Sequence, residues 1–149
     1  MAMMAKRWIG RLLALAGILL VAATPASPVA PKPIMIKGEI IDSWCQVSGI
    51  MGPAVGSAHH LCAIWCATGG IPVGLMGDDG TAYILLKADK TGTTVRNPAV
   101  IAIQSDHVTL EAELYKRDGV NYLVVSKMLG DDGVTVLSHK ELGILPFGE

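Results

Sequence analysis

The chain has 149 residues, a formal net charge of −1 and three cysteines, a length that suits one domain with its own core and is too short for two. Without the three basic residues at positions 6, 7 and 11, the balance is 9 basic against 13 acidic residues, a net charge of −4. A mildly acidic chain with no cluster of Lys and Arg argues against binding of nucleic acid or of anionic membrane surfaces.

The N-terminal segment has the three parts of a secretory signal peptide. Three basic residues come first, the apolar run 12–23 follows, and small residues end the segment near Ala26. The apolar run is too short to span a bilayer comfortably. We therefore expect residues 1–26 to be a signal peptide that directs the chain to the periplasm, and only if this segment is kept would it hold the domain at a membrane.

The remainder of the chain divides into a short linker and one domain. Residues 27–33 contain three prolines and predict an extended linker. Residues 34–149 are expected to form a single domain. Its first element is a strand over residues 34–45, which are rich in β-branched and apolar side chains, and a loop rich in Gly and Pro follows.

One helix and two hairpins come next. Ser57 is expected to cap the helix, and the pair Gly69-Gly70 to end it. Two apolar runs on either side of residues 78–80 indicate a first hairpin, and alternating residues on either side of 117–119 indicate a second. Between the hairpins, the run 98–104 fits a short helix and a buried strand equally well.

Five strands joined mostly by tight turns close most economically into a small Greek-key barrel of the oligonucleotide/oligosaccharide-binding (OB) type. The fold is therefore predicted to be mainly β, an OB-like five-stranded barrel in which a helix bearing Cys and His is inserted between the first two strands. An α+β arrangement, with one helix on an antiparallel sheet, is the alternative. Insertions of this kind commonly carry the function of a barrel.

The three cysteines and one histidine form the main candidate site. His59, Cys62 and Cys66 are spaced by three and four residues, so they share one face of the predicted helix. Cys45 ends the preceding strand, and the loop between them is long enough to bring it to the same face. Three thiolates and an imidazole match the ligands of a tetrahedral zinc site, and soft thiolates suit Cu(I) equally well.

Further side chains are predicted to lie around these ligands. Asp42 can accept a hydrogen bond from the histidine, and Met51 offers a thioether to copper. His60 lies about 100° around the helix from the ligand face and is expected near the ligands without being one. Trp44 and Trp65 flank the cysteines, where we expect them to pack and to shield the sulfurs from water.

Other interpretations of the cysteines stay open, among them inert buried thiols and an intermolecular disulfide. A disulfide from Cys45 to Cys62 or Cys66 would pin the helix to the strand and leave one thiol free, as suits an exported domain. A bridge between Cys62 and Cys66 is disfavoured, since side chains four residues apart on a helix run parallel. In a thiol-dependent redox enzyme, Cys62 near the helix N-terminus would be the nucleophile.

The residues from Asp42 to Pro72 combine into one motif, D-x-x-C followed by H-x-x-C-A-x-x-C-x-x-G-G-x-P. In this motif the chain resembles a group of small exported bacterial proteins of unassigned function. The resemblance extends from about Gly38 to about Val125. It implies a fixed structural unit around the cysteines, and it implies no substrate, because no established activity comes with the group.

These observations predict a periplasmic, non-catalytic domain that binds a transition metal, zinc or copper. Its expected role is metal handling or accessory service in a membrane redox complex, so the expected partner is a membrane or periplasmic redox protein. A disulfide-stabilised interaction domain without metal is one alternative, and a thiol-dependent redox enzyme is another.

Overall fold

The computed structural model describes residues 27–88, 92–137, 141 and 143, so the predicted signal peptide lies outside the described residues. The first strand, β1 (Lys32–Asp42), is buried along its last three residues. It ends three residues earlier than predicted, because the side chain of Asp42 caps a short helix, α2 (Ser43–Ser48). Cys45 therefore lies in a helix and not at the end of a strand.

The predicted helix is α3 (Gly56–Gly69), which ends as predicted but does not begin as predicted. The C-terminal end is as predicted, since Gly70 adopts a left-handed conformation with φ 95°. The N-terminal end has no side-chain cap. Ser57 instead accepts a hydrogen bond through its Oγ from the backbone N–H of Leu137, at 3.0 Å. The prediction that Ser57 caps the helix is therefore wrong.

Both predicted hairpins are present, as β2 (Val73–Gly77) with β3 (Ala82–Ala88) and β4 (Asp106–Arg117) with β5 (Val120–Val134). The run that the sequence left undecided contains a short helix, α4 (Pro98–Ile101). Its start explains this outcome, because Asn97 caps it and Pro98 occupies the first turn.

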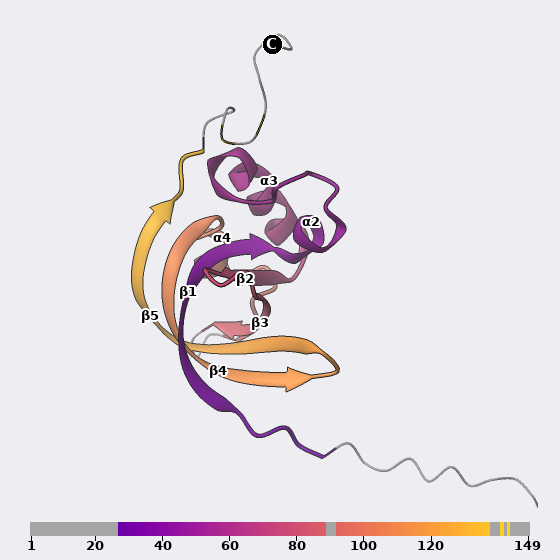
Figure 1. Ribbon diagram of the computed structural model, residues 1–149, viewed down its shortest axis with the longest axis vertical. Helices are drawn as coiled ribbons and strands as arrows, with labels where there is room; N and C mark the ends of the chain where they lie inside the picture. Colours follow the sequence, from indigo (N-terminus) through magenta and orange to yellow (C-terminus); the bar gives the residue numbers. More distant parts are fainter. Residues whose placement is uncertain (1–26, 89–91, 138–140, 142, 144–149) are drawn as a thin grey trace, which may run out of the picture.

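The five strands close into a barrel in the order β1-β2-β3-β5-β4, with β4 pairing back to β1 (Figure 1). The β3–β5 pair is parallel and the other four pairs are antiparallel. This closure confirms the mainly β, OB-like barrel with an inserted helix, and it excludes the alternative of an open α+β sheet.

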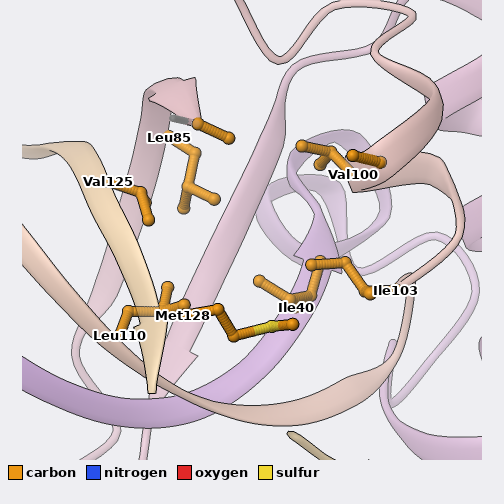
Figure 2. Close-up of a pocket in the computed structure, with 9 residues that line it drawn as sticks. Ile40, Leu85, Val100, Ile103, Leu110, Val125 and Met128 are labelled. Atoms are coloured by element: carbon orange, nitrogen blue, oxygen red, sulfur yellow. The ribbon is translucent and has the colours of Figure 1, made fainter. Parts of the chain in front are cut away.

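The core fills the barrel with aliphatic side chains from every strand, among them Ile40, Leu75, Leu85, Val108 and Leu123. An apolar cavity of about 100 Å³ lies within this core, lined by side chains of the strands and of α4. Figure 2 shows the residues that line it. None of its described lining residues is ionisable. The cavity therefore offers no acid, base or charged ligand group.

The inserted helices α2 and α3 lie together at the end of the barrel where β1 stops (Figure 1). Helix α3 contacts β1, α4 and β5, and its Ala67 belongs to the barrel core. Among the described residues, no helix has both the length and the apolar character needed to cross a membrane. The three cysteines and His59 thus lie on the inserted helices, and α3 packs against the barrel.

Candidate metal centre

Asp42 organises the site from the end of β1. Its Oδ1 accepts a hydrogen bond from the backbone N–H of Cys45 at 2.8 Å, and its Oδ2 accepts one from Nε2 of His59 at 2.6 Å. The side chain is completely buried. One carboxylate therefore fixes the first turn of α2 and, at the same time, the histidine of α3.

The charge state of Asp42 determines which histidine nitrogen is free. Burial opposes ionisation of Asp42, but the hydrogen bonds from the Cys45 backbone and the His59 ring outweigh it and lower the pKa of the carboxyl group. An ionised carboxylate only accepts hydrogen bonds, so Nε2 of His59 carries the proton. In the neutral ring, Nδ1 is then the nitrogen with a lone pair for a metal ion.

The three sulfurs come together between the two helices. Cys45 is buried in α2, and Cys62 and Cys66 are half-buried on α3. The Sγ atoms of Cys45 and Cys62 lie 3.8 Å apart, and all three sulfurs lie within 4.8 Å of one another. Three thiolates at about 2.3 Å from one tetrahedral metal ion are themselves about 3.8 Å apart. The cluster is therefore compact enough to hold a single metal ion.

The same distances bear on the disulfide alternative. All three cysteines are free, and the 3.8 Å between Cys45 and Cys62 is well beyond the about 2.05 Å of a sulfur–sulfur bond. The structure therefore does not support a disulfide from Cys45 to Cys62 or Cys66. The sulfurs of Cys45 and Cys62 are in van der Waals contact and are not covalently joined.

Burial makes the thiols of this cluster hard to ionise. It raises the pKa of Cys45 to about 12, and the neighbouring Cys62 and Asp42 add to the shift. Burial likewise raises the pKa of Cys66 to about 11. Both thiols are consequently neutral at physiological pH unless a cation compensates the thiolate charge. Such a site favours a metal ion that binds sulfur strongly enough to displace protons.

The predicted ligand His59 lies in a second group that shares Cys45 with the first. Ligand atoms of Asp42, Cys45 and His59 lie within 4.8 Å of one another. His59 belongs to the buried face of α3 with Ala63, whereas Cys62 is half-buried beside that face. The structure thus brings His59 close to the sulfur of Cys45. That His59 and all three cysteines bind the same metal ion stays a prediction.

The remaining predicted residues make other contacts or are exposed to solvent. His60 donates a hydrogen bond from Nδ1 to the carbonyl oxygen of Gln104 at 2.8 Å, which ties α3 to the segment before β4. Met51 lies in the loop between α2 and α3 and is 56% exposed, so its role as a thioether ligand stays a prediction. Trp44 and Trp65 do not shield the sulfurs by packing, because both indoles are largely exposed.

The sequence analysis missed the residues that anchor the start of α3. Glu39 of β1 accepts a hydrogen bond through Oε1 from the backbone N–H of Gly56 at 2.6 Å. The next residue, Ser57, donates its backbone N–H to the carbonyl oxygen of Thr135, just after β5, at 2.8 Å. These contacts link residues far apart in the sequence, and no local pattern signals them.

Comparisons of the sequence and the structure with known proteins found no similar protein. No family model and no curated protein matches the sequence, and no solved structure matches the chain. The functional argument therefore depends on the chemistry of the site. That chemistry combines three clustered sulfurs with a buried histidine held by a carboxylate.

Proposed function

We propose that this protein binds one soft transition-metal ion, Zn(II) or Cu(I), through the thiolates of Cys45, Cys62 and Cys66. The observation that carries the proposal is the packing of all three sulfurs within 4.8 Å of one another. Thiolate ligands select zinc and Cu(I) over hard cations such as magnesium and calcium. The oxygen-rich environment that the hard cations need is missing from this sulfur cluster.

His59 is the fourth ligand in this proposal. Its Nε2–H is held by Asp42, the arrangement of carboxylate and histidine that supports many metal sites by orienting the ring and making it more basic. Zn(II) prefers four ligands of this kind, whereas three thiolates alone satisfy Cu(I). The identity of the metal therefore depends on whether Nδ1 of His59 joins the sulfurs.

We place the function outside the cytoplasm, in metal handling or in service to a membrane redox complex. The support is the predicted signal peptide at residues 1–26, together with a small domain that has no cluster of basic residues for nucleic acid. In that setting the partner would be a membrane or periplasmic redox protein that uses the same metal.

Metal content and thiol count test the proposal together. The protein is produced with its own N-terminal segment, purified anaerobically in the form that the cells make, and analysed for metals. We expect about one zinc or copper ion per chain and three free thiols after denaturation with a chelator. A reduced protein that contains no metal and takes up neither Zn(II) nor Cu(I) would overturn the proposal.

Ligand variants locate the metal within the chain. Cys62→Ser and Cys66→Ser alter half-buried positions, so the fold should survive while metal affinity falls by more than the about 10- to 100-fold typical of a residue outside the ligand set. His107→Ala is a control outside the cluster and should leave metal affinity unchanged, because this histidine binds a different carboxylate, that of Asp78, at 2.7 Å. Substitution of Co(II) for the natural metal then reports thiolate ligation through its charge-transfer absorption.

The contact between Cys45 and Cys62 also favours a second candidate function, thiol–disulfide exchange. In this reaction the Cys62 thiolate attacks a substrate disulfide and releases one substrate thiolate. Cys45 then attacks the mixed disulfide, so that the second substrate thiol leaves and a Cys45–Cys62 disulfide remains. The two electrons pass to the substrate. A protein free of metal that loses two of its three thiols when a small disulfide is added would support this function.

A further inference from the structure

The inserted helices expose a large apolar surface around the sulfur cluster. Six large apolar side chains of α2, α3 and the loop between them are 56–83% exposed, and together we call them the α2–α3 apolar face. They are Trp44, Val47, Ile50, Met51, Leu61 and Trp65. Six exposed large apolar side chains within the 22 residues from Trp44 to Trp65 are more than the scattered single apolar residues that any protein surface carries.

The exposed residues form one stripe on each helix. Trp44 and Val47 are three residues apart on α2, and Leu61 and Trp65 are four residues apart on α3. The two helices meet where the sulfurs of Cys45 and Cys62 come within 3.8 Å. Each stripe contains the residue that directly precedes a cysteine of the cluster, Trp44 before Cys45 and Leu61 before Cys62.

This face carries no charge. From Ser43 to Gly77 the sequence contains no Asp, Glu, Lys or Arg, and the preceding acidic residue, Asp42, is completely buried. The charges of the predicted mature chain, which sum to −4, therefore lie outside this segment. Apart from the thiolates of an occupied metal centre, a partner on this face meets only uncharged side chains of this segment.

The size of the face matches a protein interface. At about 200 Å² for a fully exposed large apolar side chain, the six residues present roughly 800 Å². The largest apolar patch on a typical monomer is about 300–600 Å², and a standard interface buries about 800 Å² on each partner. The area is thus sufficient for a stable interface and large for a surface that stays in water.

We propose that a second copy of this chain packs on the α2–α3 apolar face in a two-fold dimer. A two-fold axis places the same patch of both copies in contact, so the patch must be self-complementary. The six apolar side chains of this face meet this condition without like-charge repulsion among themselves, which charged surfaces of an acidic chain would suffer. Helices that lie on membranes instead carry Lys and Arg beside their apolar face, and this segment has none.

The proposed dimer covers the candidate metal centre. Cys62 and Cys66 are half-buried in the single chain and directly follow Leu61 and Trp65 of the apolar face, so the partner copy would exclude water and oxidants from them. The apolar contacts do not involve the sulfurs as ligands. The dimer therefore stands whether or not the chain binds metal, and the two proposals fail independently.

Sedimentation velocity on the protein as the cells produce it tests the dimer. Interfaces of this area have Kd values from micromolar downwards, so we expect a dimer at about 100 μM. Trp65→Glu places a charge in the interface at a side chain that is 75% exposed, so folding should be unaffected. We expect it to weaken dimerisation at least about 30-fold, as removal of an aromatic hot spot does.

Leu61→Glu provides an optical signal for the same event, because it leaves both described tryptophans in place. Trp44 and Trp65 lie on the apolar face, so their emission should shift to longer wavelength when the dimer dissociates. Met35→Glu, at a 72% exposed position in the half of β1 away from the insertion, is the matched control and should remain dimeric.

Three results would overturn the proposal. One is a monomer at about 100 μM, well above the Kd that this area predicts. Another is a dimer that both Trp65→Glu and Leu61→Glu leave intact while circular dichroism shows them folded. The third is a monomer that binds vesicles of phosphatidylcholine through these residues, which would assign the face to a membrane. Retention of metal by monomeric Trp65→Glu would show that the metal site does not need the dimer.

Discussion

The carboxylate Oδ2 of Asp42 lies 2.6 Å from Nε2 of His59, and neither side chain is more than 4% exposed. The other oxygen of the same carboxylate accepts the N–H of Cys45 and thereby caps α2. One buried residue at the end of β1 therefore sets the positions of a helix, a thiol and an imidazole. Asp42 is the residue whose substitution is most informative about the site.

Asp42→Asn is expected to weaken metal binding about 10- to 100-fold while the fold survives. Asn caps helices as well as Asp does, so its amide oxygen can still accept the N–H of Cys45. Its NH₂ group would then face Nε2 of His59, and the ring would have to move its proton to Nδ1, where the metal should bind. Competition with a coloured chelator measures the affinity.

Asp78→Asn is the matched control for this change, because Asp78 holds His107 as Asp42 holds His59. The control should leave metal affinity unchanged. An equal loss of affinity in both variants would mean that neither histidine is specific to the site.

Metal binding is expected to weaken steeply as the pH falls. The pKa of Cys45 is raised to about 12 and that of Cys66 to about 11, so both thiols are protonated at neutral pH in the absence of metal. Ligation by both must release at least two protons, which corresponds to about a 100-fold loss of affinity for each unit that the pH is lowered. Titrations at several pH values measure this slope, and a tenfold dependence would contradict ligation by both thiols.

Glu39→Gln is expected to stabilise the protein at neutral pH. Burial raises the pKa of Glu39, although the hydrogen bond from Gly56 opposes this shift. Because the pKa is higher in the folded than in the unfolded state, stability falls as the pH rises from the unfolded-state pKa through the folded-state pKa. Gln keeps the acceptor and removes the charge, and the gain should stay below about 1 kcal/mol because the side chain is only half-buried.

Urea unfolding at acidic and neutral pH measures this difference. The gain should vanish at a pH below the unfolded-state pKa of Glu39, where both forms are uncharged. Glu111→Gln, at an exposed position of β4, is the control. A gain for Glu39→Gln that persists unchanged in acid would show that its cause is not the buried charge.

Gly56→Ala is expected to destabilise the protein by about 2–4 kcal/mol. Its φ is +60°, and an added Cβ would lie 2.7 Å from both the carbonyl oxygen of Thr135 and Cδ1 of Leu137. Gly52→Ala is the matched control, with φ +70° and nothing within 4 Å, and should cost about 1 kcal/mol from backbone strain alone. Equal losses of unfolding free energy would mean that α3 is not packed against the segment after β5.

Local patterns in the sequence were sufficient for much of the fold. The hairpins around residues 78–80 and 117–119 and the helix end at Gly70 are all present, because turn residues and apolar alternation act over a few positions. The barrel followed from the number of strands and the short turns between them. The prediction that Ser57 caps α3 was wrong, because the backbone groups at the start of this helix bond to Glu39 and Thr135, which lie far away in the sequence.

Helical spacing predicted that Cys62 and Cys66 lie close together, and the two sulfurs do meet with that of Cys45. The expected hydrogen bond between Asp42 and His59 is present, whereas His59 as a ligand together with all three sulfurs stays a prediction. The sequence did not distinguish a cluster of free thiols from a disulfide. It also did not show that Trp44 and Trp65 are exposed to solvent. Helix α3 has apolar residues around its whole circumference, so periodicity does not say which side meets the barrel. That choice came from packing against β1, α4 and β5. It placed His59 inside and Trp65 outside, with the half-buried Cys62 and Cys66 between them.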